Sequence, residues 1–254
     1  MQLVVLGSGT SVPHPARAAS GYWLDTGNDK LLLDAGSDIP HRLAQEQLDW
    51  PNLDAIWISH YHWDHMAGLP SLLFGMKWAP QTMNRTKRLQ IFGGSGLRQV
   101  LEGINAANNF QLHKLRFPVE IIEIKPGEEF QFGSSLTARI LATAHTKESF
   151  AIRLTSGNGK SLVYTSDTGF FEELISFAQD ASVLLMECSF RRDKPVETHL
   201  ELADAMRVAT NSAPETLVLT HLYPEWDDVD LETEAQSLWH GKIVQATDGL
   251  RLII

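Results

Sequence analysis

The stretch "SHYHWDHMAGLP", Ser59–Pro70, places three histidines and an aspartate within positions 60 to 65. In an extended segment alternate side chains share a face, so His60 and His62 are expected to project together. Tyr61 and Trp63 are then expected to pack on the opposite face. Neutral imidazole nitrogen binds Zn²⁺ well, and also Mn²⁺ or Fe²⁺. The stretch therefore predicts a metal site.

The pattern becomes helical after Asp64, so Asp64 and His65 are expected at a strand-to-helix turn beside the first two histidines. Gly68 follows within the first helical turns, where a residue without a side chain lets another segment approach closely. Two imidazoles at one point and an Asp–His pair next to them predict two adjacent cations.

Apolar, β-branched runs recur along the chain, and four of them end in a residue that can bind metal. These are "DAIWIS" before His60, "LTARILATA" before His145, "SLVYTS" before Asp167 and "TLVLT" before His221. Ligands of open α/β sheets gather where strand ends present their loops. We therefore expect these four side chains to form one site.

Composition limits the function classes. The 254 residues carry a net charge of −10, which disfavours long nucleic acid as a partner. The single cysteine, Cys188, excludes an internal disulfide and any cysteine-based zinc cluster. The first apolar run, "QLVVLGSGTSVP", is too short for a signal segment or a membrane span. We expect a soluble, cytoplasmic protein without membrane association.

Segments with helical spacing lie between the predicted strands. They are Ile39–Gln47, His65–Trp78, Leu97–Ala107, Phe170–Gln179 and His199–Asn211. The strands come both in antiparallel-looking clusters and in β-loop-helix units, which predicts an α/β protein with sheets covered by helices.

The motif "HYHWDH" fits the H-x-H-x-D-H signature of the metallo-β-lactamase superfamily, which the chain resembles over nearly its whole length. Further matches are "LGSGTSVP", "LLLDAG", "ATAHT", "YTSDTG" and "LTHLYP", in the family's order. The resemblance implies the metallo-β-lactamase fold, a four-layer αβ/βα sandwich of two mixed sheets flanked by helices. It also implies a single domain over residues 1–254, with two pseudo-symmetric halves that meet near residue 118.

The resemblance further implies a binuclear metal centre. One divalent ion would be held by His60, His62 and His145, and the second by Asp64, His65 and His221, with Asp167 bridging the two. Zn²⁺ is the expected metal, and Mn²⁺ or Fe²⁺ are alternatives. A metal-bound hydroxide would be the nucleophile, and Asp64 would orient it.

A second pair of residues resembles the ribonuclease Z-like branch of the superfamily. The strand "LLMECSF" contains Glu187, and "ETHLELADAMRVAT" places His199 at the start of the next helix. In that branch the histidine assists the departing oxygen, and the glutamate orients its imidazole. General acids of this kind contribute about 10²- to 10⁴-fold in rate.

The chain departs from transfer-RNA processing enzymes of that branch. Those enzymes carry a long basic arm between the third-motif histidine and the bridging aspartate, whereas here the interval from position 145 to 167 is only 22 positions. The loop "VPHPARAAS" keeps Pro13 and Arg17 but has Ala18 where the family has asparagine. The sequence therefore favours a compact phosphodiesterase acting on cyclic nucleotides or similar small phosphodiesters over a tRNA 3′-processing endonuclease.

Other functions stay open at this point. The same metal pair can attack a lactone, thioester, β-lactam or sulfate ester, so the ligands alone do not discriminate among them. A non-catalytic scaffold is disfavoured, because so many buried carboxylates and histidines are costly without cations. Trp78, Tyr223 and Trp226 are candidates to line the mouth of the site, with core packing or a dimer interface as the alternative for each. On resemblance to the family, residues 72–80 are a candidate contact of a homodimer.

Overall fold

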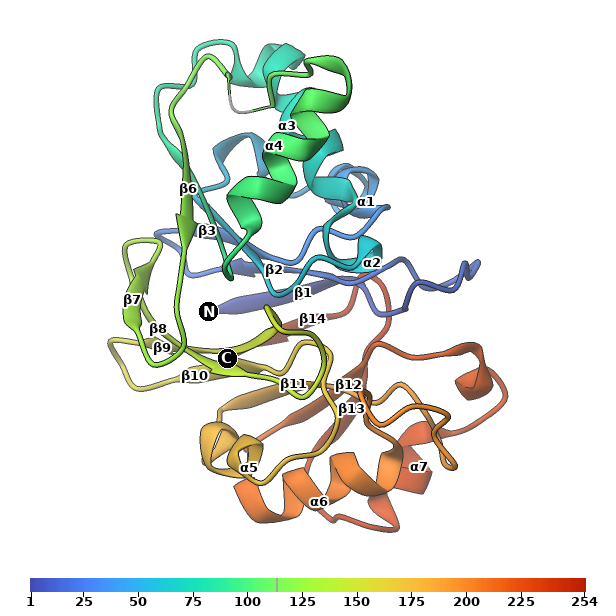
Figure 1. The fold of residues 1–254 in the computed structure, drawn as a ribbon. Coiled ribbons are helices and arrows are strands. Elements are labelled where there is room, and N and C mark those ends of the chain that lie inside the picture. The colour runs from blue at the N-terminus through green and yellow to red at the C-terminus, as the bar shows by residue number, and fades with distance from the viewer. Residues whose placement is uncertain (113) are drawn as a thin grey trace.

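In a computed structural model, which describes residues 1–112 and 114–254, two sheets pack face to face (Figure 1). The first sheet, in the order β14-β1-β2-β3-β4-β5-β6, consists of β1 (Gln2–Gly7), β2 (Gly21–Asp25), β3 (Lys30–Leu33), β4 (Ala55–Ile58), β5 (Leu89–Gly93), β6 (Val119–Glu123) and β14 (Arg251–Ile253). The second, in the order β13-β12-β11-β10-β9-β8-β7, consists of β7 (Glu129–Phe132), β8 (Leu136–Ala142), β9 (Phe150–Ser156), β10 (Ser161–Tyr164), β11 (Val183–Glu187), β12 (Leu217–Thr220) and β13 (Ile243–Gln245).

Both sheets are mixed. In the first, β1, β2 and β3 pair antiparallel, and β3 to β6 run parallel. In the second, β7 to β10 pair antiparallel, and β10 to β13 run parallel. The central parallel strands β4, β10, β11 and β12 are fully buried, which is why they read as nearly continuous apolar runs.

Helices cover the outer face of each sheet (Figure 1). The first sheet is flanked by α1 (Ile39–Gln45), α2 (Trp63–Met66), α3 (Gly68–Trp78) and α4 (Leu97–Asn108), and the second by α5 (Glu173–Ala178), α6 (Leu202–Ser212) and α7 (Leu231–Gln236). The predicted four-layer αβ/βα sandwich is confirmed. Several predicted helix boundaries differ from those observed, and one of them concerns a predicted site residue. Helix α6 begins at Leu202, so His199 lies in the segment before the helix rather than at its start.

Three layers of buried side chains hold the sandwich together. The central layer joins the sheets, with Leu31 of β3 and Leu154 of β9 among its members. One outer layer packs the first sheet against its helices, for example through Leu73 of α3. The other outer layer, which includes Met206 of α6, does the same for the second sheet. Each fully buried apolar side chain of this size contributes about 1.5–3 kcal/mol.

The chain crosses from the first sheet to the second between β6 and β7, and returns to the first sheet with β14. We propose that both halves form one domain, since β14 pairs with β1 and the central core draws on both sheets. Within the described ranges, no helix is both long and apolar enough to cross a bilayer.

Candidate metal centre

The ends of neighbouring strands position the predicted ligands. His60 follows β4 by two residues, Asp167 follows β10 by three, and His221 comes directly after β12. His221 has a left-handed backbone with φ of 57°, a conformation that non-glycine residues adopt rarely and at some cost. This conformation directs the His221 side chain into the site.

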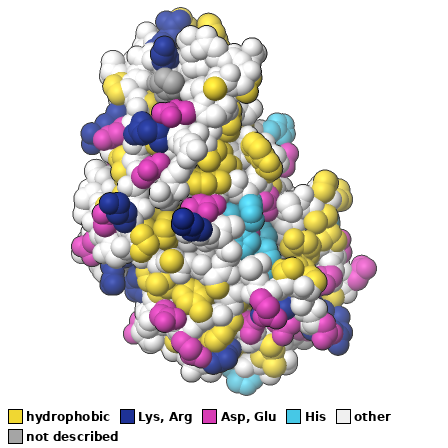
Figure 2. All heavy atoms as spheres, viewed as in Figure 1, with side chains coloured by type: hydrophobic (Ala, Val, Ile, Leu, Met, Phe, Trp, Pro, Cys, Tyr) yellow, Lys and Arg dark blue, Asp and Glu magenta, His cyan; other side chains and the backbone are white. Residues whose placement is uncertain are grey.

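One group of side chains comprises His60, His62, His145 and Asp167, whose candidate ligand atoms all lie within 4.8 Å of one another. Asp167 Oδ2 is 3.8 Å from Nε2 of both His60 and His145. His62 is exposed, so this group opens toward the surface. Figure 2 shows histidine side chains gathered in a hollow between the two halves of the molecule.

The second group comprises Asp64, His65, Asp167 and His221, and each of them is buried. His221 Nε2 is 3.4 Å from Oδ2 of both Asp64 and Asp167. His65 Nε2 lies 3.8 Å from Asp64 Oδ2. The structure thus brings all seven predicted ligands together, with Asp167 shared by both groups. That these residues bind metal ions remains our proposal.

The hydrogen-bond pattern tests whether these residues suit a cation. His145 Nδ1 lies 3.0 Å from the carbonyl oxygen of Thr198, which can only accept, so Nδ1 carries the proton and Nε2 is a free acceptor. That Nε2 is 3.1 Å from His62 Nδ1. Two ring nitrogens this close need a proton or a cation between them. Ligating histidines characteristically anchor their second nitrogen in this way.

Unpaired atoms point to the same conclusion. Within the described part of the chain, His60 Nε2, His65 Nε2 and Asp167 Oδ1 are buried without a hydrogen-bond partner. His65 Nε2 is 3.2 Å from Asp167 Oδ1, but the pair lacks hydrogen-bond geometry. Donor atoms around a tetrahedral Zn²⁺ at about 2.0–2.1 Å are about 3.3 Å apart. The spacing and the donor types therefore fit a divalent metal pair.

Charge distribution in the site favours a neutral His60 and an ionised Asp167. Burial, assisted by neighbouring His65, holds the pKa of His60 well below its usual value. Burial alone would raise the pKa of Asp167, but His221 and His65 outweigh it and hold that pKa well below the ordinary range. Neutral imidazole and ionised carboxylate are the forms that bind metal.

Asp34 is a site residue that sequence reasoning missed. It directly follows β3 and is fully buried, and its Oδ2 lies 2.7 Å from His65 Nδ1. Tyr164 OH donates to the same oxygen at 2.7 Å. The motif "LLLDAG" contained the only signal, a carboxylate ending an apolar strand. It carried no indication of which side chain this aspartate would contact.

Glu187 and His199 form a pair beside the two groups. Glu187 is buried at the end of β11, with Oε1 3.1 Å from His199 Nδ1. Its carboxylate also accepts from the backbone N–H of Thr168 at 2.6 Å and from Ser189 Oγ at 2.5 Å. The ring of His199 stacks on that of His221 with centroids 5.5 Å apart. Glu187, His199 and His221 also form a third group of candidate ligand atoms, within 4.8 Å of one another. That Glu187 orients His199 stays our proposal, which the contact with Nδ1 supports.

The backbone around the central motif is packed closely. A Cβ atom built on Gly68 would lie 2.1 Å from the carbonyl oxygen of Gly36, and one built on Gly36 would lie 2.4 Å from that of Asp64. The close approach expected at Gly68 is therefore observed. This close backbone packing holds α2 and α3 against the loop that follows β3.

The structure decides between the expectations for the aromatic residues. Trp63 does not pack on the far face but is 67% exposed, because α2 begins at this residue and turns it outward. Trp226 does not line the mouth, since it is buried and its Nε1 donates to the carbonyl of Cys188. Tyr61 does pack, and its hydroxyl donates to the carbonyl of Gly94 at 2.6 Å. Tyr223 lies near the site, with its ring centroid 6.3 Å from that of His221.

A family profile described as "Anti-Pycsar protein Apyc1" matches residues 1–243. The chain belongs to this family.

Relatives and solved structures agree with the fold. YhfI of Bacillus subtilis (strain 168), a probable metallo-hydrolase, is 29% identical over 98% of both chains. A ribonuclease Z of Thermoplasma volcanium is 26% identical over 90% of this chain and 89% of its own length. The crystal structure of the metallo-β-lactamase fold protein YhfI from Bacillus subtilis superposes with a TM-score of 0.83 at 27% identity, covering 99% of this chain and 98% of that one. The chain is a metal-dependent hydrolase of the ribonuclease Z-like branch, and the resemblance drawn from its motifs is confirmed.

Proposed function

We propose that the protein hydrolyses small phosphodiesters, such as cyclic nucleotides, and that His199 assists the leaving group. The observation that carries this proposal is the Glu187–His199 pair. His199 lies against the proposed metal ligands, with its ring 4.8 Å from that of His145 and 5.5 Å from that of His221. Attack on a carbonyl has less need of such an acid than the expulsion of a sugar alkoxide from phosphorus.

Charge and compactness support a small substrate. The net charge of −10 opposes binding of a polynucleotide. The interval between His145 and Asp167, where transfer-RNA processing enzymes carry their arm, is occupied by β9 and β10. Both strands pair within the second sheet and leave little chain for an added arm.

The site residues have defined roles in this proposal. Two divalent cations, Zn²⁺ in our proposal with Mn²⁺ or Fe²⁺ as alternatives, would polarise the phosphoryl group and lower the pKa of the attacking water. Burial alone would raise the pKa of Asp64, but its hydrogen bond with His221 and the nearby His65 lower it strongly. Asp64 is therefore ionised and can accept a hydrogen bond from the attacking water.

The surroundings of His199 favour a role as proton donor. Burial would lower the pKa of its imidazole, but the hydrogen bond from Nδ1 to Glu187 and the Glu187 charge raise it above the usual value. With Nδ1–H held by Glu187, the proton to be transferred is on Nε2. It would pass to the departing oxygen, which leaves as an alcohol.

Replacing His199 tests this role. We expect His199→Ala to slow hydrolysis of a cyclic nucleotide by about 10²- to 10⁴-fold, because the alkoxide leaving group needs protonation. A nitrophenyl phosphodiester should lose much less, since nitrophenolate departs without a proton. The measurement is kcat/KM on both substrates, with the exposed His240→Ala variant as control. Equal losses on both substrates would remove the acid role.

A substrate panel separates the remaining alternatives. Metal-loaded protein is assayed side by side on cyclic nucleotides, a nitrophenyl phosphodiester, a lactone, a thioester, a β-lactam, an aryl sulfate and a precursor tRNA. We expect the highest kcat/KM on the cyclic nucleotides. A preference for a carbon ester, the sulfate or the tRNA would contradict the proposal.

A further inference from the structure

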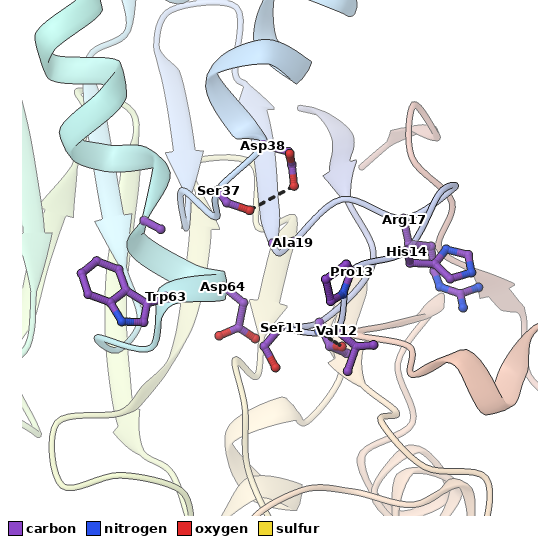
Figure 3. Close-up of a pocket in the computed structure, with 12 residues that line it drawn as sticks. Ser11, Val12, Pro13, His14, Arg17, Ala19, Ser37, Asp38, Trp63 and Asp64 are labelled. Carbon is purple, nitrogen blue, oxygen red and sulfur yellow. Dashed lines mark hydrogen bonds between the residues drawn. The ribbon is translucent and has the colours of Figure 1, made fainter.

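A pocket of about 410 Å³ opens beside the proposed metal centre. Its lining includes Val12, Pro13, Ser37, Asp38, Trp63 and Asp64. Figure 3 shows Asp64 between Trp63 on one side and the loop with Val12 and Pro13 on the other. Because Asp64 also belongs to the second ligand group, a molecule bound at the centre can extend directly into this pocket. The volume is that of a small-molecule site.

Trp63 presents an aromatic surface at this pocket. Its side chain is 67% exposed, although it stands between the site residues His62 and Asp64. A large exposed aromatic side chain beside a concave site offers a flat, apolar contact surface. It is suited to stacking against the face of a planar ring, which every nucleobase has.

The charges around the pocket favour an uncharged occupant. Arg17 and His14, the basic side chains in its lining, both contact the carboxylate of Asp227, with His14 Nε2 3.1 Å from Asp227 Oδ2. Asp38 adds a negative charge that no basic side chain of the lining pairs with. A second phosphate group would be repelled here, whereas N–H and O–H donors would be accepted.

Asp38 is available as such an acceptor. It is exposed at the N-terminal end of α1, and its side chain makes no capping hydrogen bond to that helix within the described residues. Ser37 Oγ donates to Asp38 Oδ2 at 3.0 Å, which leaves the other carboxylate oxygen for a ligand (Figure 3).

We propose that this pocket binds the nucleoside part of the substrate, with the base stacked on Trp63 and a base or sugar donor bonded to Asp38. This inference rests on the proposed phosphodiesterase function. It makes Trp63 a specificity-determining residue, since the phosphodiester itself would stay with the ligand groups around Asp167.

The test compares two substrates, a nucleoside 3′,5′-cyclic monophosphate and the 3′,5′-cyclic phosphate of ribose without a base. We expect Trp63→Ala to raise KM for the nucleotide by about 5- to 100-fold, the usual effect of losing one stacked base. KM for the base-free substrate should change less than about twofold. Trp63→Phe, which keeps an aromatic ring, should recover most of the loss. Leu238→Ala is the control, since Leu238 is also a large exposed apolar side chain, at 55%, and lies outside the pocket lining and outside the predicted dimer contact.

A binding measurement supplies a readout that is independent of turnover. Calorimetry with a hydrolysis-resistant cyclic phosphorothioate should show that Trp63→Ala raises Kd by the same factor. The metal content of the variant should equal that of the wild-type protein. An unchanged ratio of KM between the two substrates, or an unchanged Kd, would overturn the role of Trp63. If the wild-type protein hydrolyses neither substrate, the phosphodiesterase function itself fails, which is a distinguishable result.

Discussion

Asp34 accepts hydrogen bonds from three different residues beneath the site. Its Oδ1 accepts the Ser59 backbone N–H at 2.7 Å, and its Oδ2 accepts the hydroxyls of Ser59 and Tyr164, each at 2.7 Å. The fourth hydrogen bond joins Asp34 Oδ2 to Nδ1 of His65, the third residue. This arrangement fixes the proton of His65 on Nδ1, so that Nε2 faces the site with a free lone pair. Asp34 is thus a positioning residue.

Asp34→Asn tests that role. The φ of Asp34 is 58°, a left-handed conformation that asparagine tolerates, so the backbone should be preserved. An amide places a donor or a weaker acceptor opposite His65 and Tyr164, which disturbs the imidazole orientation. We expect metal affinity to fall about 10- to 100-fold, measured by chelator competition. The exposed Asp228→Asn variant is the control, and unchanged affinity in Asp34→Asn would refute the role.

The limits of sequence reasoning are visible at single residues. His60, His62, Asp64 and His65 are crowded within one motif, so their proximity could be predicted. Asp34 could not be assigned, because its partners come from distant strands. Trp63 was placed on the wrong face because the alternation of an extended segment ends where α2 begins.

At the scale of elements, a buried aspartate joins the two sheets. Asp29 lies between β2 and β3 of the first sheet, and its Oδ1 accepts from Ser134 N–H at 2.9 Å. Its Oδ2 accepts from Ser135 Oγ at 2.5 Å, in the turn between β7 and β8 of the second sheet. Gly133 supports this contact, since it has φ of 71° and a Cβ there would lie 2.8 Å from Asp29 Cγ.

This contact should make stability depend on pH. Burial alone would raise the pKa of Asp29, but the hydrogen bonds from Ser135 and Ser134 outweigh it and lower the pKa below the usual 3.8. A lowered folded-state pKa gives stability that is complete above the unfolded pKa and is lost as pH falls through the folded value.

Asp29→Asn is therefore expected to destabilise the protein by about 1–3 kcal/mol at pH 7, since it removes charged hydrogen bonds. The difference from wild type should shrink below about pH 4, where the aspartate itself becomes protonated. Urea unfolding with a chelator present, at pH 7 and at pH 3, measures both values. A difference that stays constant, or grows, as pH falls would contradict this assignment. Asp228→Asn controls for a general loss of charge.

Element types were more predictable than element boundaries. Apolar runs marked strands such as β4 and β12 because both of their faces are buried. The segment His65–Trp78 was expected as one helix but forms α2 and α3, which meet where Gly68 packs on the backbone of Gly36. His199 lies before α6 because its Nδ1 and the Leu200 N–H both bond to Glu187, which holds that segment to β11.

At the scale of the whole molecule, two sheets from different parts of the chain meet along one edge that carries the site. Residues after β4 come from the first half, and residues after β8, β10 and β12 from the second. The site therefore exists only when both halves are packed together. A homodimer through residues 72–80 stays a prediction, which sedimentation of the wild-type protein can check.

The metal content of the purified protein tests the central claim most directly. Elemental analysis after dialysis should find about two divalent transition-metal ions per chain, because the site offers two ligand groups that share Asp167. Asp167→Ala should lower that content, since both groups lose a ligand. A folded wild-type protein that hydrolyses its substrate with no bound metal would contradict the account.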